Sequence, residues 1–323
     1  MSRSAVVFGG SGFIGGHLLD SLAARGYARL LSVDIRPPVR RNPAVEYLRC
    51  DLRQPIGDRV AGSFDEAYNL AAIHTTPGHP DHEYYDANVL GALHVVEFCR
   101  ERRIERVCFT SSISVYGPGE DAKTEESPLA PVSAYGKSKL MAERVHRLWA
   151  VAEPGRRLVI ARLAVIFGPG EGGNFTRLAK ALASGFFLYP GRRDTIKGCA
   201  HVDEVVRSFE FGLARSEPVY LYNGCYPRPY TLQEVCDAFH EVGGLPRPRG
   251  TIPFWTMTAA VVPFEALNAI GLRNPICRAR VDKLVHSTHI SPRRLMQDGF
   301  VFETDLTEGL RRWKRARPDG AFV

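Results

Sequence analysis

The sequence contains few cysteines and no tract of biased composition. Its seven cysteines are scattered over 323 residues without a Cys-x-x-Cys pair, which argues against a disulfide framework or a zinc ribbon and favours a reducing, cytoplasmic location. Hydrophobic residues make up 45% and charged residues 24% of the chain, and this composition excludes disordered, collagen-like and repeat architectures. A chain of this length can bury the core of one large or two coupled domains.

Two further features are missing, a secretory signal and an uninterrupted apolar run of membrane-spanning length. The N-terminus enters an apolar segment at once, without a small-residue cleavage site. Residues 251–272 approach the length of a span, but Pro253, Pro263, Glu265 and Asn268 interrupt them. We therefore expect no transmembrane span, and interpret this segment as a buried or surface-lying helix that could touch a membrane surface.

The formal net charge of +7 is not gathered into a basic stripe. The arginines are spread along the chain in short pairs such as Arg192-Arg193, without interleaved aromatic residues. Because clustered cations mark nucleic-acid surfaces, we expect no nucleic-acid partner. The positive charge suits a phosphorylated small molecule instead.

Apolar segments of strand length alternate with amphipathic segments of helix length in the first half of the chain. This alternation predicts an α/β fold, a doubly wound parallel sheet covered by helices on both faces. The predicted strands are Ala5–Phe8, Leu30–Asp34, Val45–Cys50, Ala67–Ala72, Val107–Ser111 and Leu158–Arg162. Helices are predicted over Ile14–Arg25 and Ala87–Arg103, among others.

Beyond residue 165 this alternation weakens, and proline and glycine become more frequent. We predict a first unit over residues 1–165 and a smaller C-terminal, substrate-binding unit over residues 166–199 and 225–323. Residues 200–224 have the pattern of one more helix and strand, which we expect to return to the sheet of the first unit.

A glycine-rich turn follows the first predicted strand. The segment VVFGGSGFIGGHLL places Gly9, Gly12 and Gly15 three residues apart, between that strand and a helix. Glycine at these positions permits a tight turn, a close approach of the backbone to a pyrophosphate and close packing of helix on strand. The free N–H groups at the start of the helix favour negative charge. The pattern predicts a dinucleotide-binding site.

Acidic residues end or follow the next two predicted strands. Asp34 is placed to accept hydrogen bonds from the ribose hydroxyls of a dinucleotide and to repel a 2′-phosphate. We therefore predict NAD as the cofactor. NADP is the alternative, because the arginines at positions 36, 40 and 41 could bind such a phosphate. Asp51 and Leu52 are placed to cover the adenine.

Three residues predict the chemistry. Ser112 lies in FTSSISVYG at the end of a predicted strand, and Tyr135 and Lys139 lie in AYGKSK at the start of a helix. Because Tyr135 and Lys139 are four residues apart, they share a helix face. An ammonium beside a phenol favours the phenolate and lowers the pKa of the tyrosine. Ser112 can hydrogen-bond the oxygen that changes oxidation state, so the three residues are predicted to be catalytic.

These motifs resemble those of the extended short-chain dehydrogenases/reductases, in the nucleotide-sugar epimerase/dehydratase branch that includes UDP-galactose 4-epimerases. The matching segments are GGSGFIG, NLAAIH, NVLGA, SSISVYG, YGKSK and RLAVIFGPGEGGNF. The resemblance implies an enzyme with a Rossmann fold that moves a hydride between nicotinamide and a carbinol carbon, with Tyr135 as the acid/base. It places Tyr135 and Lys139 against the nicotinamide ribose. The further cofactor-binding residues that it implies are Phe13, Ile14, Leu70, Ala71, Ala72, Asn88 and Ala164.

The resemblance leaves the reaction open. Dehydratases of the family carry an Asp-Glu pair directly after the catalytic hydroxyl, where this chain has Ile113 and Ser114. A nucleotide-sugar epimerase or 4-keto reductase, acting at C4 in sugar-nucleotide or polysaccharide biosynthesis, therefore remains. The C-terminal segments IPFWTMTAAVVPFEAL and RVDKLVHSTHISPRRLMQDGF resemble those of 3β-hydroxysteroid dehydrogenases, so an apolar alcohol is the alternative substrate. A non-catalytic NAD sensor usually lacks the tyrosine or the lysine, and this chain keeps both.

The same resemblance provides candidates on the substrate side. The predicted substrate contacts are His74, Ser112, Asn174, Lys197 and Arg280. Val165 replaces an asparagine that UDP-galactose 4-epimerases hold against the sugar nucleotide, which is the main departure from their pattern. The histidines of the HTTPGHPDH segment match no metal-ligand spacing, and we expect no metal. The helices over 87–103 and 135–149 form a dimer interface in many relatives, so a homodimer is expected.

Overall fold

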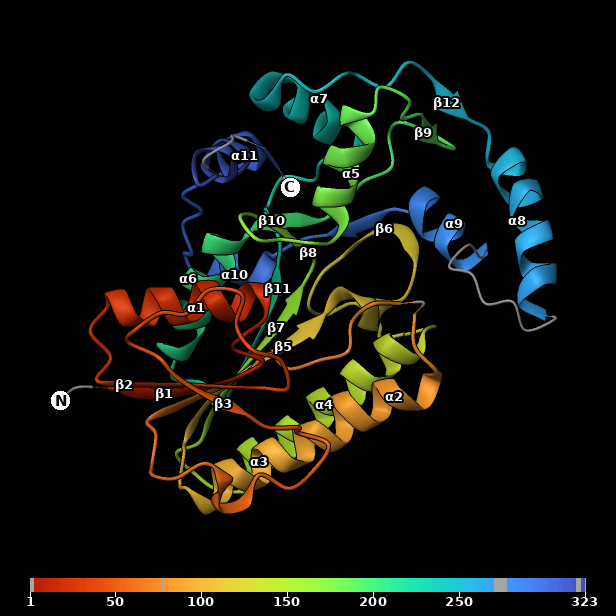
Figure 1. Ribbon diagram of the computed structural model, residues 1–323. Helices are drawn as coiled ribbons and strands as arrows, with labels where there is room; N and C mark the ends of the chain where they lie inside the picture. Colours follow the sequence, from red (N-terminus) through yellow and green to blue (C-terminus); the bar gives the residue numbers. More distant parts are fainter. Residues whose placement is uncertain (1–2, 77, 270–277, 318–320, 323) are drawn as a thin grey trace.

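Seven parallel strands form the central sheet of the computed structural model (Figure 1), which describes residues 3–76, 78–269, 278–317 and 321–322. Their order across the sheet is β11-β7-β5-β4-β1-β2-β3. The chain starts in the middle at β1, proceeds outward to β3 and then crosses back to β4, so the order reverses between β1 and β4. The doubly wound α/β sheet predicted from the sequence is confirmed. The strands are β1 (Ser4–Phe8), β2 (Arg29–Asp34), β3 (Glu46–Arg49), β4 (Glu66–Asn69), β5 (Arg106–Ser112), β7 (Arg157–Leu163) and β11 (Val219–Gly224).

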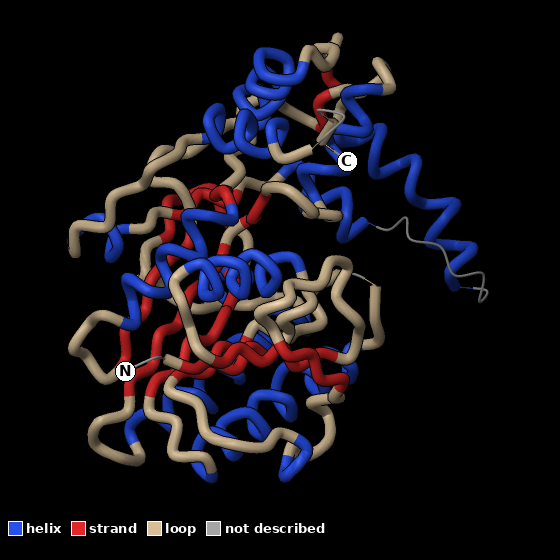
Figure 2. The backbone as a smooth tube through the Cα atoms, turned by 60° about the vertical axis from the view of Figure 1, so that its left-hand side comes forward, coloured by secondary structure: helices blue, strands red, loops and turns tan. Residues whose placement is uncertain are grey.

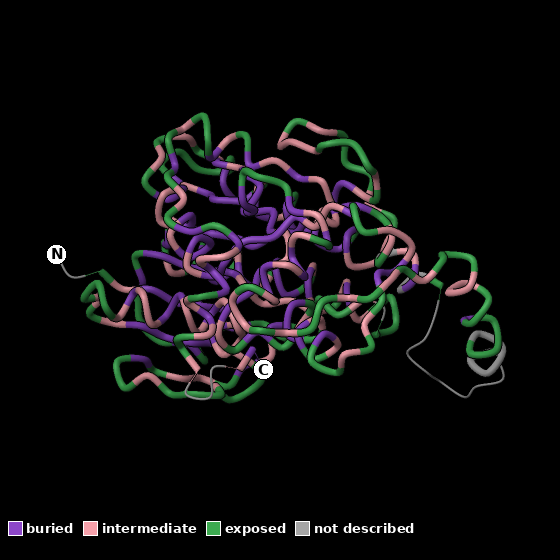
Figure 3. Tube along the Cα trace, turned by 90° about the horizontal axis from the view of Figure 1, so that it is seen from above, coloured by how far each residue is buried: buried purple, intermediate pink, exposed green. Residues whose placement is uncertain are grey.

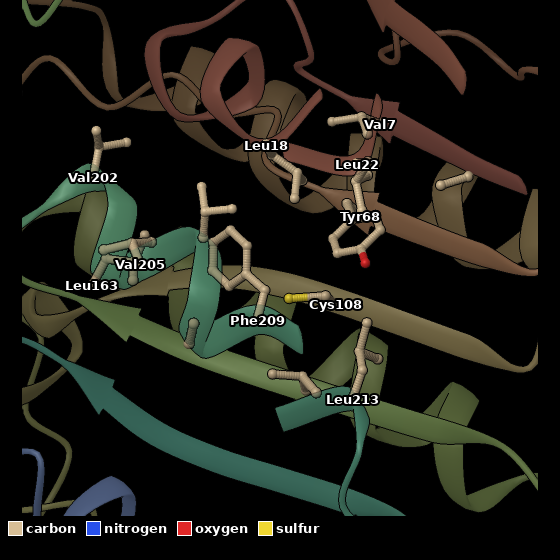
Figure 4. Packing of buried hydrophobic residues seen from close by; sticks show 14 of the residues in the cluster. Val7, Leu18, Leu22, Tyr68, Cys108, Leu163, Val202, Val205, Phe209 and Leu213 are labelled. Atoms are coloured by element: carbon tan, nitrogen blue, oxygen red, sulfur yellow. The ribbon is translucent and has the colours of Figure 1, made fainter. Parts of the chain in front are cut away.

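Helices cover both faces of this sheet (Figures 1 and 2). One face packs against α1 (Phe13–Ala24) and α6 (Val202–Leu213), and the other against α3 (Gly91–Glu101) and α4 (Ala134–Val151). Between α1, α6 and the sheet, Leu18, Leu22, Tyr68, Cys108 and Phe209 fill a dry core (Figure 4). Because Phe209 is completely buried, truncating such a ring to alanine costs roughly 3–5 kcal/mol of stability.

The six strands predicted from the sequence all form, with one informative difference. The fourth ends at Asn69 and not at Ala72. Residues 70–72 leave the sheet because the glycine turn passes directly over them: a Cβ added to Gly9 would lie 2.7 Å from the backbone nitrogen of Ala71. The helix predicted over 87–103 is also divided. Its range is occupied by a π-helical turn η2 (Asp86–Leu90) and α3, and a further helix, α2 (Asp81–Tyr85), precedes it directly.

The C-terminal part of the chain contains three two-stranded sheets and most of the remaining helices. The strand pairs are β8 (Val165–Phe167) with β10 (Cys199–His201), β6 (Gly119–Lys123) with β13 (Thr288–Ile290), and β9 (Tyr189–Pro190) with β12 (Thr251–Ile252). The helices are α5 (Asn174–Ala183), α7 (Leu232–Gly243), α8 (Phe254–Ala269), α9 (Arg278–Val285), α10 (Arg293–Gln297) and α11 (Leu306–Arg315). Short 3-10 helices, η1 (Gly57–Arg59) and η3 (Ile113–Tyr116), complete the elements. The strand of segment 200–224 adds to the main sheet as β11 beside β7, while the division of the chain into two units at residue 165 stays a prediction.

Aromatic side chains dominate the core of this C-terminal part, where Phe175, Phe239 and Trp313 are buried. The six cysteines in the described ranges are buried and free. Within those same ranges, no helix combines the length and the apolar character needed to cross a membrane.

Candidate functional site

The predicted cofactor and catalytic residues gather at the carboxyl ends of five neighbouring strands. The glycine turn follows β1, Asp34 ends β2, residues 70–72 follow β4, Ser112 ends β5 and Ala164 follows β7. In open parallel sheets, ligands bind outside the carboxyl ends of the strands where the strand order reverses. The reversal between β1 and β4 lies at the centre of this set, so the residues surround the expected crevice.

The glycine turn has no room for side chains. Gly9 has a φ of +80°, which side chains disfavour, and a Cβ on Gly15 would lie 2.4 Å from the carbonyl oxygen of Gly9. Gly12 is the N-cap of α1, and no side chain in the described residues caps that helix. The first N–H groups of α1 are therefore left without a side-chain cap in the described residues. This geometry fits the diphosphate of a dinucleotide.

Asp34 stabilises the same turn. Its carboxylate accepts hydrogen bonds from the backbone N–H of Ser11 (3.2 Å) and of Arg36 (3.0 Å). Of the arginines that could bind a 2′-phosphate, Arg40 pairs with Asp20 of α1 and the Arg41 guanidinium stacks 5.4 Å from the ring centre of Tyr47. All three of these arginines, at positions 36, 40 and 41, are exposed. This arrangement favours NAD over NADP at the ribose.

Three other predicted cofactor residues have clear structural partners. Arg53 hydrogen-bonds the Asp51 carboxylate (Nη2–Oδ2 2.7 Å), which lowers the pKa of that carboxyl. Leu52 is buried against α3 at Gly91. Phe13 and Ile14, in the first turn of α1, pack on the core beneath them. Their contacts with a cofactor stay predictions.

Asn88 lies in the π-helical turn η2 and holds two elements of the site together. Its Oδ1 accepts a hydrogen bond from the backbone N–H of Ile73 (2.9 Å). Its Nδ2 donates to the carbonyl of Ile73 (3.1 Å) and to Oγ of Ser138 (2.9 Å). The residue therefore connects the loop after β4 to α4, and π turns recur at such functional positions. Asn88 contributes to the predicted cofactor site by fixing this loop.

The three residues predicted to be catalytic lie on two elements, Ser112 at the end of β5 and Tyr135 and Lys139 in α4; their catalytic roles stay predictions. Ser133 N-caps α4 by accepting from the N–H of Gly136 (3.1 Å), which sets the half-buried Tyr135 in the first turn. The Ser112 hydroxyl donates to Oγ of Ser114 (3.2 Å). Burial raises the pKa of the Tyr135 phenol and the Ser112 side chain opposes this shift, whereas Lys139 has no resolved effect on it, so the lowering by Lys139 predicted from the sequence is not found. The ring of Tyr84 lies 6.3 Å from that of Tyr135, centre to centre. Spacing along the chain could not reveal Tyr84, because it belongs to a different helix.

Lys139 is buried one helical turn beyond the tyrosine. Its ammonium nitrogen lies 4.4 Å from the ring centre of Phe109 on β5, a cation–π contact. Burial lowers the pKa of Lys139 to about 7, and the Glu143 carboxylate opposes this shift. Glu143 in turn pairs with Arg162 (2.8 Å) and accepts a hydrogen bond from Ser111 (2.6 Å). Glu143 is not part of the sequence motifs. Its position four residues after Lys139 was the one signal in the sequence that could have placed its carboxylate near the lysine.

The predicted substrate contacts are less closely grouped. His74 is exposed, and partial desolvation together with the charges of Arg36, Lys139 and Arg177 lowers its pKa. Asn174 is exposed at the start of α5, where Glu171 accepts from the N–H of Thr176 (2.9 Å). The Lys197 ammonium donates to the carbonyl of His286 (2.9 Å), and burial lowers its pKa to about 8. Arg280 lies in α9, but its side chain is outside the described residues. These four substrate assignments stay predictions.

A cavity of about 490 Å³ lies at the opposite, amino end of the strands. It is lined by Glu66, Arg106, Arg25 and Glu210, among others. Its buried Glu66 already accepts hydrogen bonds from Tyr27, Tyr68 and Arg106 (2.8–3.2 Å), so this carboxylate is satisfied within the protein. In the described ranges, no three His, Cys, Asp or Glu residues are arranged to hold a metal ion.

Comparison with known proteins identifies the family. The model of the NAD dependent epimerase/dehydratase family matches residues 5–221. An N-acetyl-alpha-D-glucosaminyl-diphospho-ditrans,octacis-undecaprenol 4-epimerase of Escherichia coli O157:H7 is 28% identical over 315 residues, 97% of this chain and 94% of that protein. The human sterol-4-alpha-carboxylate 3-dehydrogenase, decarboxylating, is 31% identical over 179 residues, 53% of this chain and 46% of that protein.

Solved structures agree on the fold. UDP-glucose 4-epimerase from Bifidobacterium longum, in complex with NAD+ and UDP, superposes with a TM-score of 0.74 at 22% identity, covering 98% of this chain and 99% of that one. The resemblance noted in the sequence, its enzyme class and its nicotinamide cofactor are thereby confirmed. The chain belongs to the NAD dependent epimerase/dehydratase family.

Proposed function

We propose that this protein is a C4 epimerase for a sugar carried on a diphosphate. The observation that supports this best is the grouping of Ser112 at the end of β5 with Tyr135 and the buried Lys139, one turn apart in α4, beside a turn shaped for a dinucleotide diphosphate. Ile113 and Ser114 leave no carboxylate pair for dehydration. The relatives from E. coli O157:H7 and B. longum are both named 4-epimerases, and both names describe a sugar on a diphosphate carrier.

We propose NAD as the cofactor, retained through the catalytic cycle. The N-terminus of α1 would hold its diphosphate, Asp34 its adenine ribose, and Asp51 and Leu52 its adenine. Tyr135 and Lys139 would contact the nicotinamide ribose. When bound, the nicotinamide ring supplies the acceptor and donor of the hydride exchanged at the sugar carbon.

Tyr135 is the acid/base of the proposed reaction. Its phenolate takes the proton of the C4 hydroxyl as that carbon is oxidised, and the Ser112 hydroxyl donates a hydrogen bond to the same oxygen as it becomes a carbonyl. The 4-keto sugar then turns over in the site, so that its other face is reduced. Tyr135 returns the proton to the C4 oxygen. Lys139 stabilises the phenolate when its ammonium is protonated. Glu143 supports that protonation, because it raises the lysine pKa against burial.

Cations around His74 provide the proposed site for the substrate diphosphate. Arg36, Lys139 and Arg177 are all close enough to depress the pKa of His74. We propose that His74 and Asn174 contact the diphosphate-linked sugar, while Lys197 and Arg280 would approach it from the segments around residues 197 and 280. Val165 stands where the nucleotide-sugar epimerases have an asparagine, so the carrier group beyond the diphosphate is held differently here.

Purification without added cofactor tests the proposal directly. The protein is denatured, the released nucleotide is quantified, and fresh protein is incubated with UDP-glucose or UDP-N-acetylglucosamine and with the corresponding polyprenyl-diphosphate sugar. Near-stoichiometric bound NAD and formation of the C4 epimer of one of these, without added cofactor, support the epimerase. An empty protein that forms no epimer and consumes NAD(P)H in proportion to product would contradict it.

A dehydrogenase of an apolar alcohol is the second candidate function. It is favoured by the exposed apolar side chains of α8 and by the human sterol dehydrogenase among the relatives. In the same experiment, this function requires added cofactor and accepts a 3β-hydroxysterol in place of the sugar substrates.

We also propose a cytoplasmic homodimer. Leu93 of α3 and Met141, Leu148 and Val151 of α4 are exposed apolar residues on two helices that pack together. Burying them against a second copy would remove this apolar surface from water. Sedimentation analysis should show a dimer for the native chain and a monomer for Leu148→Glu; an unchanged mass would place the interface elsewhere.

A further inference from the structure

The helices α8 and α9 form a hairpin that stands away from the rest of the molecule (Figures 1 and 2). Seen from above, it extends from one side of the body, and much of the described part of α8 is exposed (Figure 3). Its base is fixed: β12 pairs with β9 before α8, and β13 pairs with β6 after α9. At the same base, a Cβ added to Gly191 would touch both Val285 and Phe254. The hairpin is therefore a projection from a rigid support.

The side chains that α8 exposes over residues 254–264 are apolar. Trp255 is 71% and Val262 61% exposed, and Phe254 and Phe264 each 36%. The other two tryptophans, Trp149 and Trp313, are at most 5% exposed. The helix has sixteen residues and a single charged one, Glu265. Helices that face water normally carry a polar face, so this composition indicates another environment for α8.

The described part of α8 is shorter than a membrane span. At 1.5 Å per residue, sixteen residues extend about 24 Å, short of the roughly 30 Å hydrocarbon core of a bilayer. Pro263 also interrupts the helix from within. Trp and Phe side chains are, in contrast, enriched where a protein surface meets the headgroup region of a membrane.

Positive charge lies next to this apolar helix. The sequence of α9, RARVDKLV, carries Arg278, Arg280 and Lys283 against one acidic residue, and the side chain of Arg278 is exposed. Basic residues beside an apolar helix complement anionic lipid headgroups, each contributing about 1 kcal/mol near such a surface. A second copy of the chain is the other conceivable occupant. The apolar residues suited to that role are those of α3 and α4, however, which pack on the opposite part of the sheet domain (Figure 1).

We propose that α8 lies on the surface of an anionic lipid bilayer, with Trp255 and Val262 inserted at the headgroup boundary and Arg278 of α9 against the headgroups. The strand pairing of β13 with β6 then orients the loop that follows Ser112 relative to the membrane. This inference is independent of the reaction catalysed, because it rests only on the exposed surface of the hairpin.

Vesicle flotation with the purified full chain tests the proposal, without any substrate present. The chain is mixed with vesicles of phosphatidylcholine alone or of phosphatidylcholine with phosphatidylglycerol, at low and at physiological salt. We expect binding to the anionic vesicles, at least about tenfold weaker binding to the neutral ones, and weakening by salt. Tryptophan emission should shift to shorter wavelength on binding, since Trp255 is the exposed one of the three.

Matched variants assign the binding to the hairpin. The double variant Trp255→Glu/Val262→Glu should lose at least about tenfold in affinity for anionic vesicles. Val301→Glu is the control, because Val301 is equally exposed (71%) but lies outside the hairpin, and its affinity should be unchanged. Both variants should keep the native circular dichroism spectrum and NAD binding.

Three results would overturn the proposal. The first is failure of the native chain to bind anionic vesicles, a measurement that needs no variant. The second is undiminished vesicle binding by the double variant. The third combines two measurements: the native chain does not bind vesicles, and the double variant has a different oligomeric mass from the native chain. This result would make the hairpin an interface between copies. Epimerase activity on a water-soluble UDP-sugar is assayed separately, so loss of the proposed function would leave this result intact.

Discussion

Acidification should lower the free energy of unfolding of this protein through His146, a fully buried histidine in the same helix as Lys139. Its ring stacks on Phe109 at 4.1 Å between centres, its Nδ1 bonds the carbonyl of Ala142 (2.8 Å) and its Nε2 bonds the Asn69 amide (3.2 Å). Burial lowers the pKa of His146 from 6.5 to about 4; the Ala142 carbonyl opposes this shift and the charge of Lys139 adds to it. The imidazole is therefore neutral in the folded protein at pH 7.

The sign and size of the effect follow from proton linkage. Above pH 6.5 the histidine is neutral in both states and has no effect. As the pH falls, the unfolded chain binds the proton and the folded chain does not, so the free energy of unfolding decreases. With pKa values of 6.5 and about 4, the loss is about 2 kcal/mol at pH 5 and approaches about 3 kcal/mol once the pH is below 4.

Urea unfolding at pH 7 and pH 5 measures this loss. The variant His146→Gln, which does not titrate, should lose about 2 kcal/mol less than the native chain between these two pH values. His82 is exposed, so the control His82→Gln should keep the full loss. If native chain and His146→Gln lose the same free energy, another group titrates and the burial argument for His146 is wrong.

Three predictions concern the cofactor and the chemistry. Tyr135→Phe should lower kcat by roughly 10²–10⁴-fold with NAD affinity within a few-fold, because the phenol moves a proton and the ring keeps its place; steady-state kinetics with NAD titration would detect retained activity, which refutes the acid/base role. Gly15→Ala places a Cβ 2.4 Å from the Gly9 carbonyl and should weaken NAD binding by at least about tenfold. If calorimetry shows the native affinity, the diphosphate does not bind at this turn. Asp34→Ala should relax discrimination against NADP, measured as the ratio of the two dissociation constants. An unchanged ratio would mean that the arginines after Asp34, and not its carboxylate, decide the selectivity.

The sequence predicts those parts of the site that depend on local geometry. Gly9, Gly12 and Gly15 imply their own turn, because only glycine tolerates the backbone conformation and the close contact found there. Tyr135 and Lys139 share a face because any helix places residues four apart together. Ser112 could be added because the end of a central parallel strand has a predictable position.

Contacts between distant segments could not be predicted in this way. Nothing in the spacing along the chain reveals that the Lys139 ammonium contacts the ring of Phe109, or that Tyr84 packs beside Tyr135. The limit of β4 at Asn69 is similar, since the backbone of the glycine turn, from another part of the chain, excludes residues 70–72 from the sheet. Lys197 is a further example. Its charge is evident from the sequence, but its hydrogen bond to the carbonyl of His286 depends on the fold.

One buried chain of hydrogen bonds connects the catalytic helix to the C-terminal segment. Glu143 pairs with Arg162, whose Nη1 donates to the phenol oxygen of Tyr116 (2.9 Å). Tyr116 donates to Oδ1 of Asn223 (2.7 Å), and Nδ2 of Asn223 donates to the carbonyl of Ser291 (2.9 Å). Each link has a partner on both sides, so no charge in the chain is left uncompensated.

The purpose of this chain of bonds is positional. A buried ion pair adds little net stability over apolar side chains, yet removing one partner costs about 3–5 kcal/mol because the other charge stays buried. Glu143 and Arg162 are each at most 3% exposed, so neither can relax towards water. Their pairing therefore restricts α4, and with it Tyr135 and Lys139, to one position relative to β7. Through Asn223, the same chain of hydrogen bonds fixes the segment after β13 relative to α4 and β7. The predicted catalytic residues are thereby aligned with the C-terminal part that is predicted to bind the substrate.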